Sequence, residues 1–528
     1  MKIHPFHCTC VCSHSPAELH APSYEFTRRD FLYSVGALTV AGLGSAAGQQ
    51  PPSDARAGLQ RGPFTRSPIK VQPVLTYEVP QRRTATSWRN WGGIQTESDA
   101  NGEKERIGNE LAKMSAQADF PLEIRPVELV RAVPRATDIA QGDHDVLLLY
   151  AAGGGGNLLE ALTTPGKWNL MFLRHDPGPV YLWYEIVHPR FLRKTVDDFG
   201  QSGWDVQDVV VDETSELLWR LRALSGLKHT LNKRIVAVGG ASGWGRGGGN
   251  APQRTRELWK MELIDFPYKD LSRRIQEARR NSALIDRCTQ GAGHYLQQQG
   301  VSLHTTREFV NNAFLLTEVF KDVMAEAQTD AITINSCMGT IMPMSETTAC
   351  LPLSLLNDEG YLAFCESDFV VIPSGVLLHY LSGKPVFLND PTYPHGSLVT
   401  LAHCSAPRKM DGNRLEPAKI LTHFESDYGA APKVEMRLGQ ACTNLVPDFA
   451  SRKWVGFEGT IVGNPALDIC RTQIDVRIHG DTTALLEEMK GFHWMTSYGD
   501  YLKETSYALR KMGVGFLDIS ASAGKERA

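Results

Sequence analysis

The chain has 528 residues, of which 42% are hydrophobic and 22% are charged, and its formal net charge is −4. This composition excludes disordered, collagen-like and miniature disulfide-rich proteins and predicts about two to four domains with their own cores. The near balance of 55 basic and 59 acidic residues argues against a general nucleic-acid binder. The body of the chain has no uncharged apolar run of membrane-spanning length, which argues against a polytopic membrane protein.

Residues 1–47 are typical of a twin-arginine signal peptide. The paired arginines at positions 28 and 29 precede a weakly apolar stretch from Ser34 to Leu43, and the small residues Gly44 to Ala47 follow. We expect the twin-arginine export machinery as a partner and a periplasmic or otherwise exported location. The apolar stretch contains too few large side chains for a stable membrane anchor. An ordinary N-terminal extension with a chance arginine pair is the alternative.

Residues 48–70 are rich in Pro, Gly, Gln and Arg and are predicted to be a linker. An N-terminal α/β domain is expected over residues 71–238, because apolar strand-like runs alternate there with amphipathic stretches. The expected strands are Val146–Tyr150, Asn169–Leu173, Val209–Val211 and Arg234–Val238, and the expected helices include Tyr181–Val196 and Ser215–Leu224.

A second α/β domain that carries the acidic site residues is expected over residues 239–395, with helical patterns at Asp270–Arg280 and Thr305–Ala325 and a strand at Ala331–Asn335. Both domains are expected to be Rossmann-like or flavodoxin-like layers with parallel sheets. From residue 396 to 528, short alternating segments separated by turns predict an antiparallel β-rich, barrel-like domain. These segments are Lys433–Arg437, Gly456–Val462 and Thr472–Ile478, and a closing helix is expected over Tyr501–Met512.

Two glycine clusters, Gly153–Gly156 and Gly239–Gly249, each follow an expected strand. The first lacks a complete dinucleotide fingerprint, and the second lacks the Lys-Ser/Thr of a phosphate-binding loop. A tight turn and a mobile loop or hinge are the simpler interpretations. A nicotinamide-dependent oxidoreductase is the corresponding functional alternative, and sugar contact through Trp244 is the alternative for the second cluster.

Of the ten cysteines, three lie in the predicted signal peptide, and none of the other seven forms a Cys-x-x-Cys pair. We therefore expect small buried hydrophobic residues rather than a disulfide framework or a zinc site.

Candidate metal ligands lie in the last third of the chain. Glu366 and Asp390 each follow an apolar, strand-like run, and a helical pattern separates them. Two such strand ends are expected at one edge of a parallel sheet. Together with His403 and His493 they would suit a hard divalent cation, Mn²⁺ or Mg²⁺.

Each of these residues also has a structural alternative: a surface carboxylate at a strand end, a turn-forming aspartate, or a packed histidine. Two nearby acids, Glu346 and Asp368, could substitute as ligands. Arg408 and Arg471 could hold sugar hydroxyls or pair with acids.

The segments around Glu366, Asp390 and His403, together with the Gly-Phe-His-Trp sequence ending at Trp494 and the Tyr-Gly-Asp sequence ending at Asp500, carry a family resemblance. The chain resembles the L-fucose isomerase and L-arabinose isomerase superfamily, above all its fucose isomerase-like branch. The resemblance spans roughly residues 120–515, with its specific motifs within residues 350–505.

The resemblance implies a metal-dependent aldose–ketose isomerase that acts on a sugar or sugar derivative through an ene-diol. Glu366 and Asp390 would bind Mn²⁺ and act as the acid–base pair, and His403 and His493 would be further ligands. Trp244, Arg408 and Trp494 are the candidate substrate-binding residues. The resemblance also implies a homo-oligomer, a trimer or hexamer. An export signal departs from the superfamily pattern, so an exported carbohydrate-binding protein or an inactive scaffold is the alternative.

Overall fold

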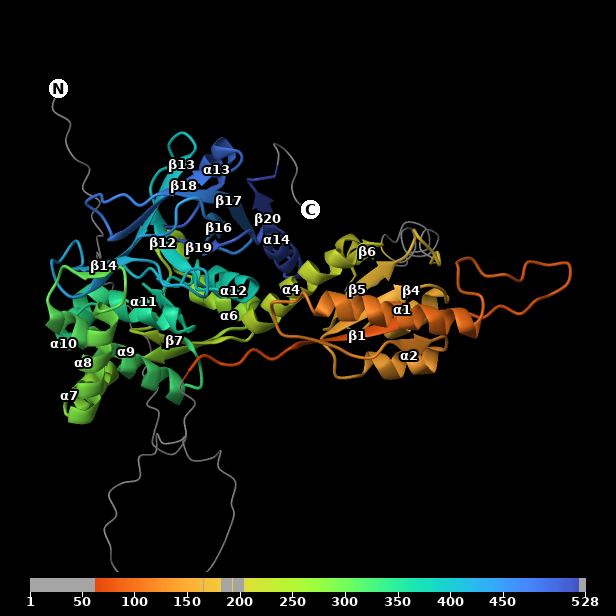
Figure 1. Ribbon diagram of the computed structural model, residues 1–528, viewed down its shortest axis with the longest axis horizontal. Coiled ribbons are helices and arrows are strands. Elements are labelled where there is room, and N and C mark those ends of the chain that lie inside the picture. Colours follow the sequence, from red (N-terminus) through yellow and green to blue (C-terminus); the bar gives the residue numbers. More distant parts are fainter. Residues whose placement is uncertain (1–61, 165, 182–191, 193–203, 522–528) are drawn as a thin grey trace, which may run out of the picture. The chain divides into compact units, whose positions relative to one another are not determined.

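The computed structural model of the protein describes residues 62–164, 166–181, 192 and 204–521 (Figure 1). The predicted signal peptide, most of the predicted linker and most of the expected helix Tyr181–Val196 lie outside the described residues. Among the residues described, no helix combines the length and apolarity needed to cross a membrane.

The first sheet has six strands, all paired in parallel, in the order β2-β1-β4-β5-β6, with β3 also pairing with β1. Its strands are β1 (Ile69–Thr76), β2 (Leu122–Ile124), β3 (Glu128–Val130), β4 (Val146–Ala151), β5 (Trp168–Leu173) and β6 (Val209–Val211). Its helices are α1 (Glu97–Ser115), α2 (Val133–Ala140), α3 (Gly156–Leu162) and α4 (Thr214–Thr230), and a short turn η2 (Val206–Asp208) precedes β6.

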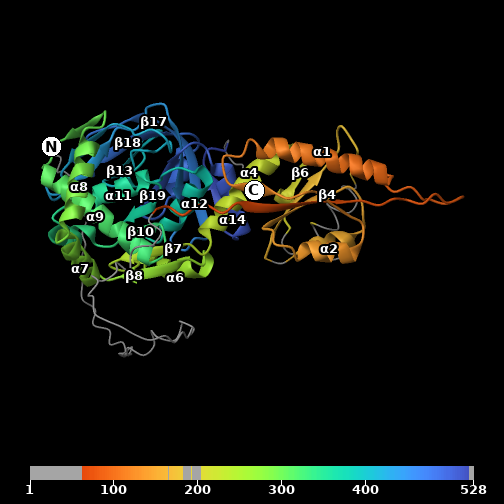
Figure 2. The same ribbon diagram turned by 60° about the horizontal axis from the view of Figure 1, so that its bottom comes forward.

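Helices cover both faces of this sheet, and α1 and α2 lie on opposite sides of it (Figure 2). Side chains of β4 alternate between the two cores because successive residues of a strand point to opposite faces. Leu148 and Tyr150 pack with residues of α1 and α4, whereas Leu147 and Leu149 pack with residues of α2 and α3. Burial on both faces explains why β4 is a continuous apolar run.

The second sheet has four parallel strands in the order β11-β10-β7-β8. The strands are β7 (Arg234–Val238), β8 (Glu262–Phe266), β10 (Ala331–Ile334) and β11 (Leu362–Cys365). The helices of this region are α5 (Gly245–Gly248), α6 (Ala251–Leu258), α7 (Tyr268–Arg279), α8 (Ser282–Leu296), α9 (Arg307–Glu326), α10 (Met342–Ser345), α11 (Cys350–Asp358) and α12 (Ile372–Ser382), with a π-helical turn η3 (Cys337–Ile341). The strand Arg234–Val238, expected in the first domain, therefore belongs to the second sheet.

A closed antiparallel barrel of six strands forms the C-terminal region, in the order β16-β19-β12-β13-β18-β17, with β16 pairing back to β17. Figure 1 shows these strands in cyan to blue. Their bounds are β12 (Phe387–Pro391), β13 (Leu398–His403), β16 (Ala441–Val446), β17 (Lys453–Gly463), β18 (Thr472–Ile478) and β19 (Trp494–Tyr498). The expected antiparallel β-rich region is therefore present.

Smaller elements complete this region. Strand β20 (Gly515–Asp518) pairs in parallel with β17, and β9 (Val301–Leu303), β14 (Ala418–Leu421) and β15 (Ala431–Val434) form a three-stranded sheet. Helix α13 (Thr482–Glu488) precedes β19, and the expected closing helix is α14 (Leu502–Lys511).

Strand β12 corrects the expected division of the chain at residue 395. It was placed with the second α/β domain, yet it pairs with β13 and β19 and is a barrel strand. The apolar run of β12 does not distinguish a parallel sheet strand from a barrel strand, because both faces of the run are buried in both cases. The barrel therefore includes Asp390, one of the candidate ligands.

Candidate metal centre

Glu366 lies at the carboxyl end of the second sheet, directly after β11. Its φ of 67° and the φ of 46° at Ser367 place two consecutive residues in the left-handed region. Such conformations are uncommon for residues other than glycine and concentrate at functional sites. The chain turns sharply here, and Ser242 forms an isolated bridge with Asp368.

Three other candidates come from neighbouring barrel strands. Asp390 on β12 lies opposite Ala402 of β13, and Asn389 lies opposite Trp494 of β19. This register brings Asp390 between His403, which ends β13, and His493, which precedes β19. The sequence suggested that Glu366 and Asp390 share one edge of a parallel sheet, and this expectation is wrong. They meet because the second sheet and the barrel contribute one carboxylate each.

The four side chains converge closely. His493 Nε2 is 3.3 Å from Glu366 Oε2 and 3.2 Å from Asp390 Oδ1. His403 Nε2 is 3.6 Å from Glu366 Oε1. Ligand atoms of Asp390, His403 and His493 all lie within 4.8 Å of one another, and those of Cys365, Glu366 and His403 form a second such group. We call Glu366, Asp390, His403 and His493 the ligand cluster.

Two buried atoms of the ligand cluster, Glu366 Oε2 and His403 Nε2, make no hydrogen bond of good geometry to any described residue. Glu366 Oε2 contacts His493 at 3.3 Å and His403 Nε2 contacts Glu366 at 3.6 Å, both as ion-pair distances. Buried polar atoms are nearly always satisfied, so these two atoms, each with a lone pair to offer, are suited to bind a cation. Two carboxylates and two imidazoles are a donor set for Mn²⁺ and related divalent ions. Asp390, whose side chain is 44% exposed, is the member that faces solvent.

Asp368 orients His493. Its Oδ2 accepts a hydrogen bond of 2.8 Å from His493 Nδ1, and its Oδ1 accepts bonds from the backbone N–H groups of Trp244 and Val370. The bond at Nδ1 assigns the tautomer and leaves Nε2 to face the cluster. The sequence offered Asp368 only as a substitute ligand. The position of Asp368 two residues after Glu366 indicated that it lies near the site. Its hydrogen-bond partner His493 could not be identified from the sequence.

His403 has a weaker partner of the same kind. Its Nδ1 lies 3.0 Å from Ser405 Oγ, so its Nε2 also faces the ligand cluster. Both histidines are almost completely buried. Their rings are therefore held from behind, as is usual for metal-ligating histidines.

The charges within the cluster are strongly coupled. Burial alone would raise the pKa of Glu366, but His403 and His493 outweigh burial and hold that pKa below its usual range. Burial also opposes a charged His493, yet Asp390, Asp368 and Glu366 outweigh it and raise the pKa of His493 well above its usual value. A carboxylate-rich pocket that favours a cation in this way would also favour a divalent metal ion.

Trp244, the candidate from the second glycine cluster, lies beside the ligand cluster. Its ring meets that of His493 edge-on at 5.3 Å and lies 5.9 Å from that of Phe492, which is 50% exposed. The Gly239–Gly249 loop that carries Trp244 is closely folded, since a Cβ on Gly243 would lie 2.2 Å from the Gly248 oxygen. Phe492 was not among the sequence-based candidates, although it adjoins His493.

Arg408 and Trp494 lie elsewhere. Trp494 is fully buried in the core beside Phe457, because it follows His493 and points to the opposite face of the strand. Arg408 is also buried, and its guanidinium donates to the Glu416 carbonyl and to Gln298. These positions correct the expectation that the two side chains contact substrate.

The remaining candidates also have other partners. Glu346 pairs with Arg279 at 3.0 Å on the surface. Arg471 donates to the carbonyl and hydroxyl oxygens of Thr422. The seven described cysteines are free thiols, six of them buried, as the sequence predicted.

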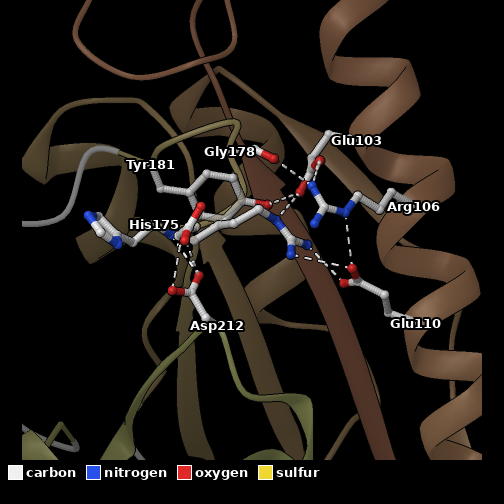
Figure 3. Close-up of polar contacts among 9 residues, drawn as sticks. Glu103, Arg106, Glu110, His175, Gly178, Tyr181 and Asp212 are labelled. Carbon is white, nitrogen blue, oxygen red and sulfur yellow. Dashed lines mark hydrogen bonds and ion pairs between the residues drawn. The ribbon is translucent and has the colours of Figure 1, made fainter.

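A second polar cluster lies at the carboxyl edge of the first sheet (Figure 3). We call it the first-sheet network. Buried Arg174, which follows β5, pairs with Glu103 at 2.7 Å and with Glu110 at 2.8 Å. Tyr181 donates to Glu103, and Arg106 pairs with Glu110 at 3.0 Å and donates to the Gly178 carbonyl.

The nearby Gly153 fits the simpler interpretation of its loop. A Cβ there would lie 3.2 Å from the backbone nitrogen of Glu78, so glycine permits a close approach of two chain segments.

Comparison of the chain with models of known protein families and with curated protein sequences finds no match in either.

Proposed function

We propose that this protein is a metal-dependent aldose–ketose isomerase that acts on a sugar or sugar derivative. The observation that carries the proposal is the proximity of Glu366, Asp390, His403 and His493, with buried atoms on Glu366 and His403 that make no hydrogen bond to the described residues. Mn²⁺, or another hard divalent cation such as Mg²⁺, is the proposed cofactor.

The chemistry needs two groups that exchange protons with adjacent carbons and oxygens. In the proposed reaction, one carboxylate of the Glu366–Asp390 pair removes the proton next to the carbonyl, and the other serves the hydroxyl oxygen as the ene-diol forms and collapses. Asp390, as the exposed member, is accessible to a sugar. A bound divalent cation would stabilise negative charge that develops on the sugar oxygens.

Asp368 would hold His493 in one orientation throughout the reaction through its 2.8 Å bond to Nδ1. The exposed ring of Phe492 and the ring of Trp244 would form an apolar wall beside the sugar. The same wall supports the second candidate function, carbohydrate binding without catalysis on an isomerase scaffold.

The finer assignments rest on the sequence resemblance. We propose membership in the L-fucose isomerase and L-arabinose isomerase superfamily, assembly as a trimer or hexamer, and export by the twin-arginine route. The strand order β2-β1-β4-β5-β6 is that of a flavodoxin-like sheet and supports a Rossmann-like or flavodoxin-like first region.

The test is the metal content of the purified protein, followed by a screen of aldoses for ketose formation. The expected result is about one Mn²⁺ per chain, lost in Glu366→Gln and in Asp390→Asn but retained in the control Glu346→Gln. Isomerisation should disappear with the metal. Absence of bound metal in the parent after Mn²⁺ is added back would refute the proposal. Sugar binding that is independent of metal would favour the second candidate.

A further inference from the structure

A cavity of about 310 Å³ lies at the amino edge of the second sheet. Arg234, the first residue of β7, lines it, whereas Glu366 follows the carboxyl end of β11. Since the two strands run parallel within one sheet, the cavity and the ligand cluster lie at opposite edges. The lining includes five basic side chains, Arg66, Lys228, His229, Lys233 and Arg234.

Three of these cations have carboxylate partners. Lys228 pairs with Asp145 at 2.6 Å, Arg234 pairs with Glu262 at 2.9 Å, and Lys233 pairs with Asp330. Lys233 also donates to the Tyr380 hydroxyl at 2.8 Å. Each of these three carboxylates is therefore already paired with another cation.

Arg66 is a fourth cation that lines the cavity. Within the described part of the chain, its guanidinium has no carboxylate partner and instead donates to His379 Nε2 at 3.0 Å and to the backbone oxygens of His379 and Tyr380. His379 Nδ1 donates to the Lys384 carbonyl at 2.8 Å, which makes Nε2 an acceptor. Neutral groups therefore hold the guanidinium in place without neutralising it.

The surroundings compensate the positive charge of Arg66 only in part, because the carboxylate that favours its charged form, Asp330, is paired with Lys233. Burial, aided by Arg66 and the nearby lysines, lowers the pKa of His229 to about 4 and that of His379 to about 3. Both rings are therefore neutral near pH 7. A fixed guanidinium without a directly paired carboxylate, in a partly enclosed space, is suited to bind an anion.

We propose that this cavity binds the phosphate group of a small phosphorylated compound, or phosphate itself, with Arg66 as the principal ligand. The guanidinium N–H groups that do not donate to His379 or Tyr380, Nε–H among them, can donate to phosphate oxygens. Hydroxyl and amide side chains of Thr65, Ser67 and Asn232 also line the cavity and can hydrogen-bond further oxygens. Its volume is at the lower end of the range for small-molecule sites and leaves room for a short organic part.

Calorimetric titration of the full-length, metal-free protein tests this proposal, because removal of metal prevents phosphate from binding at the ligand cluster. The probes are inorganic phosphate, glycerol 3-phosphate and glycerol at constant ionic strength. We expect both phosphates, but not glycerol, to bind once per chain. Tighter binding of the ester would identify a phosphorylated compound as the ligand, and equal affinities would identify phosphate itself.

The matched variants are Arg66→Gln and Arg82→Gln. Arg82 is an exposed residue between β1 and α1, so its removal changes the net charge equally. Arg66→Gln should weaken phosphate binding at least about tenfold, and Arg82→Gln should leave it unchanged. Arg66→Lys keeps the charge but loses the planar guanidinium that His379 and Tyr380 hold in place. It should give an intermediate affinity and serves if the glutamine variant misfolds.

Two results would overturn the proposal. One is the absence of saturable phosphate binding up to about 10 mM in the parent. The other is equal loss of affinity in the Arg66 and Arg82 variants, which would indicate only a general charge effect. Neither result depends on isomerase activity, so this proposal and the proposed function fail independently.

Discussion

The first-sheet network and the ligand cluster are both buried groups of charged side chains, but only one of them is internally balanced. Arg174 is enclosed by Glu103 and Glu110, with Tyr181 and Arg106 closing the remaining positions. In the ligand cluster, Glu366 and Asp390 face two histidines, and two buried atoms make no hydrogen bond to any described residue. A balanced network stabilises the fold, whereas an unbalanced one is suited to a ligand.

The largest effect should come from breaking the balanced network. Arg174→Leu would leave buried Glu103 with only the more distant Arg106, at 3.8 Å, as a cationic partner. It should lower the free energy of unfolding by about 3–5 kcal/mol, measured by urea denaturation. The metal content of the folded variant should not change. The control Arg106→Leu removes a more exposed partner and should cost about 1 kcal/mol or less. Loss of metal from Arg174→Leu without loss of stability would contradict the division of roles.

Removal of a carboxylate from the ligand cluster should have the opposite effect: loss of metal binding with little loss of stability. Glu366→Gln removes a carboxylate ligand and should weaken Mn²⁺ binding by about 100-fold or more, equivalent to about 2.7 kcal/mol, in a calorimetric titration. The metal-free variant should unfold within about 1 kcal/mol of the metal-free parent. Added Mn²⁺ should stabilise the parent but not the variant. A large loss of stability without metal would mean that Glu366 is structural.

A smaller loss of Mn²⁺ affinity is expected from a change at Asp368, which orients the ligand His493. Asp368→Asn keeps an oxygen for the backbone N–H groups of Trp244 and Val370, but its amide nitrogen cannot accept from His493 Nδ1. Mn²⁺ affinity should fall about 10- to 100-fold in the same titration. Ser405→Ala, which removes the hydroxyl beside His403, is the matched control and should change the affinity by only a few-fold. Equal effects of the two variants would argue against a special role for Asp368.

The strand and helix patterns were largely readable from the sequence. The runs Val146–Tyr150 and Asn169–Leu173 correspond to β4 and β5, and the closing helix corresponds to α14. The spacing of apolar residues is a local property of the chain, so it indicates the type of element whatever the tertiary arrangement. Sheet membership is not local, which is why Arg234–Val238 and the strand of Asp390 were assigned to the wrong regions.

The candidate site was likewise only partly predictable from the sequence. Carboxylates and histidines that suit a divalent cation could be selected by residue type and position. The structure brings them into two groups that share His403, one with Asp390 and His493 and the other with Glu366 and Cys365. Trp494 and Arg408 could not be separated from the site by type, because an aromatic ring or a guanidinium suits a sugar and a core equally well. Their exclusion follows from burial and from the partners of Arg408.

The sequence by itself determined the kinds of element in this protein, the absence of membrane-length runs in its body and the residue types able to hold a metal. Only the tertiary structure decided that Glu366 comes from a parallel sheet and Asp390 from a barrel, and that Asp368 lies behind His493. The reason is that element type depends on neighbouring residues along the chain. The site depends on hydrogen-bonded register between strands such as β12 and β19, which lie far apart in the sequence.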